Sequence, residues 1–558
     1  MKTRKSALAL AIGLLLTIFF DVFLHSAVFI LHGKMSQLVT IMALLISLAM
    51  AYIVGKKLDI KRPYLIPVIL FATLAISIFL GSITLDTTYD GNTYHKQAIG
   101  SLKDGWNPVY NDIGNLFSNT YPKASWIFAG SIYQLTGNIE SGKAINFIIL
   151  AITFFAAYWY IGIRLSREKS ALTALLLALS PVATMQLFSN YVDGIMGSLL
   201  VVLTIFLNAL VDKKVKTPRI YLYSTIVILI VIICNLKFTG IVYAGIIAVI
   251  YLLYVIWKRN WHMMRQLVLV GSASLMLAIG VVGASPYIRN FVVHGQPLYP
   301  LMGNGSVDIM KNNMPASYAH KNRVYKFLES NFGETDNKSY SRTLNDGGQV
   351  DSKLKIPFTF NLEEVQLLSY NYPDLRQAGY GVWFGGILLV SGVAALYILL
   401  KNRHIVRKED LPLILLPIVP IILTALATDA AWWARYLPQL IIFPILILVL
   451  LYVGKSKLLA SLLSFALLFN ITLIFVLAVS YQLQNVKPIN DRIRSLVTCN
   501  VEKPPQEIIV TKYFDSYFMG STYNMLDICS NLKIKYAVSV DDMDYTEIWN
   551  GIYIKNHT

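Results

Sequence analysis

The side chains best suited to acid–base chemistry gather in one polar stretch, residues 85–122. It carries Asp86, Asp90 and His95 among tyrosines, asparagines and glycines, in a chain that is otherwise mostly apolar. A carboxylate or an imidazole in such a setting can accept a proton from a reacting hydroxyl group. Aspartate also serves as a helix cap or turn residue, so each acid has a structural alternative. We predict that this stretch forms one half of an active site.

Four further ionisable residues stand at the ends of apolar runs. Asp193 lies in a short polar turn, and Lys237, Arg289 and Arg435 each adjoin a hydrophobic segment. Cations at such places suit a phosphate group, which a guanidinium can bind through two parallel hydrogen bonds. The alternatives are a lysine that reaches to lipid headgroups, an arginine that anchors a helix end, and an ion pair between Lys237 and Asp193.

The composition is typical of a protein embedded in a membrane. Of its 558 residues, 56% are hydrophobic and 14% are charged, whereas soluble domains carry about 25% charged residues. A helix needs roughly 20 apolar residues to cross a bilayer. Runs near this length occur thirteen times, at 8–31, 38–54, 63–81, 143–163, 171–188, 194–211, 220–234, 240–257, 266–285, 379–400, 411–428, 436–453 and 458–480. The predicted fold class is therefore an all-α polytopic membrane protein with about thirteen transmembrane helices.

The distribution of Lys and Arg predicts how the chain lies in the membrane. These residues collect in the N-terminal segment and in alternate short loops, and this face accounts for the net charge of +17. Because cytoplasmic loops are rich in Lys and Arg, the N-terminus is predicted to be cytoplasmic and, after thirteen spans, the C-terminus extracytoplasmic. The long polar segments 83–142, 286–378 and 481–558 then share the non-cytoplasmic face, where we expect the active site. The positive charge reflects topology and gives no support for nucleic-acid binding.

The chain divides into a membrane domain, residues 1–480, and a small extracytoplasmic α/β domain, residues 481–558. Strand character is found at Glu507–Thr511 and Tyr536–Val540, and a helix is expected near Asp515–Met525.

The tail also contains two of the three cysteines, Cys499 and Cys529. In an oxidising compartment they could form a disulfide, and the alternative is two free thiols. Cys234, at the end of an apolar run, is predicted to be a small buried residue.

Aromatic residues indicate where the outer membrane surface lies. Residues 123–135 are apolar but too short to cross, which predicts a helix lying on the interface with Trp126 and Tyr133 at headgroup depth. Trp432 and Trp433 mark an interfacial belt, or a platform on which a sugar ring could stack.

Two outer segments place Asp and Arg close together in the chain. The second long segment shows little periodicity until Asn361–Ser369, and it closes with Asp374 and Arg376. The next outer turn places Asp429 before Arg435, again as an expected Asp–Arg pair.

Short motifs on the outer face together resemble one family. In chain order they are Asp90 with Tyr94-His95, Asn119-Thr-Tyr-Pro122, Leu-Thr-Gly137, Asp193, Lys237 in Leu-Lys-Phe-Thr-Gly, Arg289-Asn290 with Gly-Gln-Pro-Leu-Tyr-Pro300, Gly379-Tyr-Gly381 and Arg435-Tyr-Leu-Pro438. The set, over roughly residues 60–455, resembles integral-membrane glycosyltransferases of the GT-C superfamily, especially the protein-mannosyltransferase and lipid A aminoarabinose-transferase type.

The resemblance implies transfer of a sugar from a polyprenyl-phosphate-linked donor to an acceptor on the non-cytoplasmic face, with inversion at the anomeric carbon. It implies Asp90 as general base, with Asp86 as the alternative acid. Lys237, Arg289 and Arg435 are implied contacts to the donor phosphate.

The same resemblance implies that Tyr94, His95 and Asp193 orient the sugar or the acceptor, which is a glycan, a lipid or a protein. A divalent metal is used by some relatives and stays a candidate cofactor. The resemblance also implies a bacterial plasma membrane as the location.

Other classes remain open at this stage. A polymerase or ligase that moves a whole lipid-linked glycan shares the one-sided layout of polar residues. A lipid or saccharide transporter is disfavoured because its coupling residues belong near the middle of the membrane. The chain has no Walker loop, no HExxH motif and no cysteine cluster with zinc spacing, which disfavours ATP-driven transport by this chain alone.

Overall fold

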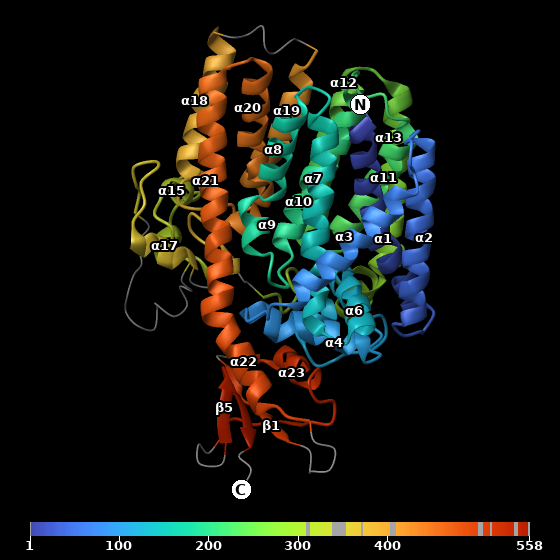
Figure 1. Cartoon of the computed structure of the whole chain (residues 1–558), viewed down its shortest axis with the longest axis vertical. Helices are drawn as coiled ribbons and strands as arrows, with labels where there is room; N and C mark the ends of the chain where they lie inside the picture. Colours follow the sequence, from blue (N-terminus) through green and yellow to red (C-terminus); the bar gives the residue numbers. More distant parts are fainter. Residues whose placement is uncertain are drawn as a thin grey trace.

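A bundle of helices forms most of the molecule, and a small domain with a β-sheet lies at one end of it (Figure 1). The N-terminus lies at the opposite end of the bundle. The computed structural model describes residues 2–307, 313–337, 353–369, 372–401, 409–499, 506–513, 516–540 and 545–555. The predicted domain boundary near residue 480 falls where the last long helix leaves the bundle.

The bundle is built from the apolar runs of the sequence. Its helices are α1 (Lys2–Ile30), α2 (Gln37–Lys57), α3 (Leu65–Ser82), α7 (Ala144–Ile161), α8 (Arg167–Ala178), α9 (Pro181–Met185), α10 (Asp193–Val211), α11 (Arg219–Cys234), α12 (Phe238–Trp257), α13 (Trp261–Leu277), α18 (Phe384–Lys401), α19 (Leu411–Ala427), α20 (Ile442–Val453) and α21 (Lys457–Tyr481). Within the described residues, eight helices are long and apolar enough to cross a membrane, and four further apolar helices are shorter. These helices confirm the predicted fold class, an all-α polytopic membrane protein. Helices suit a lipid environment because they satisfy their backbone hydrogen bonds internally.

One predicted span is wrong as a continuous helix. The run 171–188 is broken between α8 and α9 at Ser180, because Pro181 disfavours helical backbone in the residue before it and has no N–H to bond one turn back. Pro181 instead takes the first position of α9. The break leaves residues 186–192 as a turn that leads into α10.

The first long loop, residues 83–142, folds into short helices: η1 (Gly91–His95), a π-helix, then α4 (Lys96–Lys103), α5 (Leu116–Thr120) and α6 (Ala124–Thr136). The helix at 123–135 is present as α6, but the predicted position of Trp126 and Tyr133 among lipid headgroups is wrong. Trp126 and Tyr133 are only 2% and 1% exposed, because α6 is packed against α1, α4 and the segment before α7. Both aromatic rings therefore lie inside the protein.

The second long segment contains α17 (Leu362–Ser369), as predicted, and also α15 (Arg323–Phe332), which the sequence did not indicate. The inner face of α15 is polar: Lys326 and Glu329 are buried. Lys326 pairs with Asp429 at 2.7 Å, and Glu329 pairs with Lys321 at 2.7 Å. The apolar side chains Val324, Tyr325 and Leu328 are instead about half exposed, so the face of α15 that packs on the protein is the polar one.

The C-terminal domain is the predicted small α/β unit. After α21 the chain continues through η11 (Gln482–Val486) and α22 (Lys487–Leu496) into a four-stranded sheet of order β4-β1-β6-β5. The strands are β1 (Glu507–Val510), β4 (Lys533–Tyr536), β5 (Tyr545–Trp549) and β6 (Ile552–Lys555), and α23 (Met519–Leu526) precedes β4. The predicted strand at 536–540 begins and ends later in the chain than the observed strand β4. The predicted helix near Asp515–Met525 is present as α23, although Asp515 itself lies outside the described residues.

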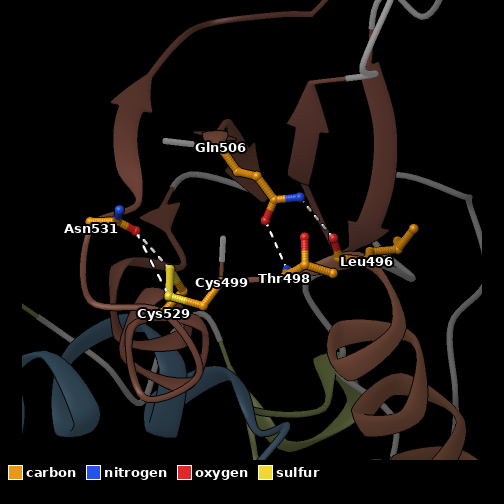
Figure 2. The surroundings of a disulfide bond; sticks show 6 residues. All are labelled: Leu496, Thr498, Cys499, Gln506, Cys529 and Asn531. Carbon is orange, nitrogen blue, oxygen red and sulfur yellow. Dashed lines mark hydrogen bonds between the residues drawn. A yellow bond between two sulfur atoms is a disulfide. The ribbon is translucent and has the colours of Figure 1, made fainter. Parts of the chain in front are cut away.

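A disulfide joins Cys499, which follows α22, to Cys529, which follows α23 (Figure 2). Beside it, the side chain of Gln506 accepts a hydrogen bond from the amide of Thr498 and donates one to the carbonyl of Leu496. Cys234 is buried at the end of α11.

Candidate active site

Asp90 lies at the start of η1, at the end of the bundle that faces the tail. Its side chain is 22% exposed, and its Oδ2 is 3.6 Å from Nη1 of Arg435. Burial raises the pKa of Asp90 above its usual value, and the positive charge of Arg435 partly offsets this shift. A hydrogen bond to Tyr94 also favours the ionised form.

Arg435 is the centre of an acidic cluster. Besides Asp90, its guanidinium contacts Asp374 at 2.8 Å and Asp193 at 3.8 Å. The side chain is buried, and these carboxylates raise its pKa, so it stays fully charged. A planar guanidinium with five N–H donors can hold several acids at once.

The second cation of the cluster is Lys237, which precedes α12 and pairs with Asp193 at 2.6 Å. Asp193 is the first residue of α10, where a helix favours negative charge. Gln186 fixes this end of α10: its amide donates to Asp193 at 3.4 Å, and its carbonyl accepts from the backbone of Gly194 at 2.7 Å. The predicted ion pair between Lys237 and Asp193 is present.

Asp374 is a member of the cluster that the sequence analysis did not select as a site residue. It pairs with Arg376 at 2.6 Å, in addition to Arg435. The predicted pair of Asp429 with Arg435 is wrong, because Asp429 turns to Lys326. The adjacent Asp-Leu-Arg sequence was the only signal for Asp374, and it did not show that Arg435 would join the pair.

Aromatic rings surround the cations. The guanidinium of Arg435 lies 5.1 Å from the ring centre of Tyr191 and 4.6 Å from that of Trp433, and Lys237 lies 4.3 Å from that of Tyr436. Trp433 is 1% exposed and its Nε1 donates to the backbone carbonyl of Asp374, so its assignment to a membrane belt is wrong. Trp432, 2% exposed, stacks on Trp433 and is equally buried within the protein.

His95 is held in a neutral state close to this wall. Its Nδ1 accepts a hydrogen bond of 2.6 Å from Nε1 of Trp126, so the ring proton resides on Nε2. Burial lowers the pKa of His95 to about 3. The neighbouring ring of Tyr94 lies 4.3 Å from His95, centre to centre. The pair forms an aromatic surface next to Asp90.

Asp86 occupies a structural position. It is fully buried, and its carboxylate accepts three hydrogen bonds, from the amide of Thr88 and from the backbone and side chain of Asn190, at 2.7–2.9 Å. These bonds tie the loop before η1 to the turn before α10. This arrangement favours Asp90 over Asp86 as the acid that meets a substrate.

Arg289 contacts a different acid. In the described part of the chain its guanidinium pairs with Asp112 at 2.8 Å, and Asp112 is 61% exposed. The next residue, Asn290, donates to the carbonyl of Thr120. Arg289 and Asn290 thus contact residues 112–120 of the first long loop, and Arg289 pairs with none of the acids that contact Arg435 in this part of the chain.

Asp86 and Asp90 of the loop are both engaged by protein groups. Across the described ranges, no group of three or more His, Cys, Asp or Glu side chains is arranged to hold one. The carboxylate of Asp86 is used by hydrogen bonds from the protein, and that of Asp90 faces Arg435.

Comparisons with known proteins give a limited set of matches. No family model and no curated protein matches the chain. Among solved structures, the chain is similar to ArnT from Cupriavidus metallidurans in the apo state, with 11% identity, a TM-score of 0.42, and coverage of 85% of this chain and 86% of that chain. A second structure, ArnT from the same organism bound to undecaprenyl phosphate, gives 14% identity, a TM-score of 0.40 and the same coverage.

The structure thus brings four predicted site residues into direct contact: Asp90, Asp193, Lys237 and Arg435. Tyr94 and His95 adjoin them, whereas Asp86 is hydrogen-bonded to Thr88 and Asn190. Arg289 pairs with Asp112.

Proposed function

We propose that this protein is a membrane glycosyltransferase that moves a sugar from a polyprenyl-phosphate-linked donor to a hydroxyl acceptor on the non-cytoplasmic face. The observation that carries the proposal is the difference between Asp90 and the other two acids around Arg435. Asp193 and Asp374 are 2% and 5% exposed and form ion pairs of 2.6 Å. Asp90 is 22% exposed, and its cation is 3.6 Å away. Asp90 is therefore the acid of this cluster most open to a substrate.

In the proposed reaction, Asp90 accepts the proton of the acceptor hydroxyl, and the oxygen of that hydroxyl attacks the anomeric carbon of the donor sugar. The bond between that carbon and the phosphate oxygen breaks, and the departing phosphate takes the electron pair. Lys237 and Arg435 stabilise its charge. A single displacement inverts the anomeric centre.

The ion pairs inside the cluster prepare the cations for this role. Asp193 takes one of the three N–H donors of Lys237, and Asp374 orients the guanidinium of Arg435. Cations held by fixed acids need little reorganisation when charge develops on the phosphate.

The test is sugar transfer from radiolabelled polyprenyl-phosphate sugars in membranes that carry the wild type or Asp90→Asn at equal expression. We expect transfer by the wild type and a loss of about 100-fold or more in the variant, the usual scale for removal of a general base. Asp491→Asn is the control, because Asp491 is an exposed acid of α22 that pairs with Lys487, outside the cluster around Arg435. Transfer that survives in Asp90→Asn would contradict the assigned base, and a wild type inactive with every donor would contradict the function.

A further inference from the structure

The C-terminal domain contacts the first long loop on both sides of Asp90. On one side, Leu85 is 3% exposed and belongs to the same buried apolar cluster as Phe518 and Met525 of the tail. The ring of Tyr89 packs edge-on against Phe518, with 5.9 Å between ring centres. The residue directly before Asp90 is thus in contact with the tail.

On the other side, the contact is a hydrogen bond. Ser521 of α23 donates from Oγ to Oδ1 of Asn92 at 2.7 Å. Asn92 is fully buried, and its Nδ2 donates to the carbonyls of Asp86 and Thr88 at 3.0 and 2.7 Å. Ser521 therefore fixes the side chain that closes the turn carrying Asp90.

The backbones of α23 and the loop approach so closely that glycine is required. A Cβ atom on Gly520 would lie 2.8 Å from the carbonyl oxygen of Asn92 and 2.8 Å from Cβ of Lys96. On the facing helix, a Cβ on Gly100 would overlap the ring of Tyr523. Docking of α23 on η1 and α4 is thus a close fit, and α23 lies directly below α4 in Figure 1.

A buried polar network extends the contact. The side-chain amide of Asn524 accepts from Nζ of Lys96 at 2.7 Å and donates to Oε1 of Glu140 at 2.8 Å. The other oxygen of Glu140 accepts from the backbone amide of Asp86 at 3.0 Å and pairs with Lys143 at 2.7 Å. Since buried charges are costly unless each is bonded, Asn524 completes a network that holds the loop.

The network also reaches the second half of the site. Asp86, whose amide is held by Glu140, binds the backbone and side chain of Asn190 through its carboxylate. Asn190 stands in the turn that leads to Asp193. One set of contacts from the tail thus orders both Asp90 and the segment before Asp193.

We infer that α23 of the C-terminal domain is a positioning element for the transfer reaction, which holds Asp90 in place beside Arg435. Ser521 and Asn524 are positioning residues, because they act through Asn92 and Glu140. The inference rests on the proposed function, in which Asp90 is the base. A displacement of about 1 Å in a reacting group can cost on the order of 100-fold in rate, so docking of the tail controls the chemical step.

Gly520→Ala separates docking from folding of the tail. Alanine favours a helix more than glycine does, so α23 itself keeps its structure, while the new methyl group pushes it away from Asn92. We expect kcat to fall at least tenfold, the donor KM to stay within about twofold, and hydrogen exchange to increase in peptides covering residues 86–103. Exchange in β1 and β4 should remain that of the wild type.

Gly245→Ala is the matched glycine control, since a Cβ on this α12 residue meets open space. Gln506→Ala is the control within the tail, because its side-chain amide bonds Leu496 at the end of α22 and Thr498 in the following turn, away from α23 (Figure 2). Both controls should retain wild-type kcat and wild-type exchange in the loop.

Ser521→Ala tests the same contact without added bulk, and Ser521→Thr keeps the hydroxyl group. We expect a lower kcat and faster loop exchange in Ser521→Ala, and recovery of both in Ser521→Thr. Wild-type kcat and loop exchange in both Gly520→Ala and Ser521→Ala would overturn the inference. So would equal loss of exchange protection in the loop and in β1 in both variants, since the effect would then be general unfolding. Hydrogen exchange needs no donor substrate, so it tests the docking of α23 even if the wild type transfers no sugar. An inactive wild type would overturn only the proposed function.

Discussion

Oδ2 of Asp90 lies 3.6 Å from Nη1 of Arg435, and this contact joins the first long loop to the turn before α20. Arg435 also holds Asp193 and Asp374, so acids from three separate segments meet at one guanidinium. Asp90 remains the most exposed of the three acids. The contact therefore combines a proton acceptor with a fixed positive charge, as transfer from a phosphate leaving group requires.

The pH dependence of transfer should report the ionisation of Asp90. A base works when ionised, and burial raises the pKa of Asp90, so kcat/KM should fall with decreasing pH at a higher pH than for an ordinary aspartate with a pKa of 3.8. His95, with a pKa of about 3, should not contribute to this limb. The check is a pH–rate profile of the wild type and His95→Gln, whose acid limbs should coincide. A limb that moves in His95→Gln would assign it to the histidine.

Removal of Arg435 should shift the same limb. The guanidinium favours the ionised form of Asp90, so Arg435→Gln should move the acid limb to higher pH and lower kcat by roughly 100-fold, through loss of a charge at the departing phosphate. Thermal unfolding checks that the variant is folded. An unchanged limb in a folded Arg435→Gln variant would contradict the contact between the two groups.

Lys237→Met should reduce transfer by about 10- to 100-fold, because the charge nearest the proposed phosphate site is lost. It should also destabilise the protein by about 3–5 kcal/mol, because Asp193, 2% exposed, loses its closest ion-pair partner. The double variant Lys237→Met/Asp193→Asn should regain stability without regaining activity. Thermal unfolding and donor titration measure the two effects separately, and recovery of both together would show that Lys237 acts only through stability.

Asp86→Asn should affect stability more than chemistry. The new amide nitrogen replaces an oxygen that accepts hydrogen bonds from Thr88 or Asn190, which should cost about 1–3 kcal/mol. At a temperature where the variant is folded, its kcat should stay within tenfold of the wild type. The comparison is with Asp90→Asn under the same conditions. A larger loss in Asp86→Asn than in Asp90→Asn would reverse the roles of the two acids.

Removal of the disulfide should weaken the C-terminal domain. With a sequence separation of 30 between Cys499 and Cys529, replacement of both by alanine should cost about 3–4 kcal/mol on the chain-entropy model. Limited proteolysis of the tail, with and without reductant, measures the effect. Cys234→Ala is the control, because this buried thiol lies in the bundle and should not alter the response to reductant.

The sequence alone determined the membrane class, the approximate helices and the separate tail, because these depend on the hydrophobicity and length of local segments. It also selected Asp90, Asp193, Lys237 and Arg435, whose types suit phosphate and acid–base chemistry. The broken span at Pro181 was foreseeable from the proline itself.

The tertiary structure decided which of these residues meet. Local patterns do not report whether Trp126 faces lipid or the protein interior, or whether Arg435 pairs with Asp429 or with Asp374. They also missed α15, whose buried face is polar. Contacts between segments distant in the chain arise from how the helices pack, and a local pattern does not identify the partner of a charged residue. For the same reason the docking of α23 beside Asp90 emerged only from the folded molecule.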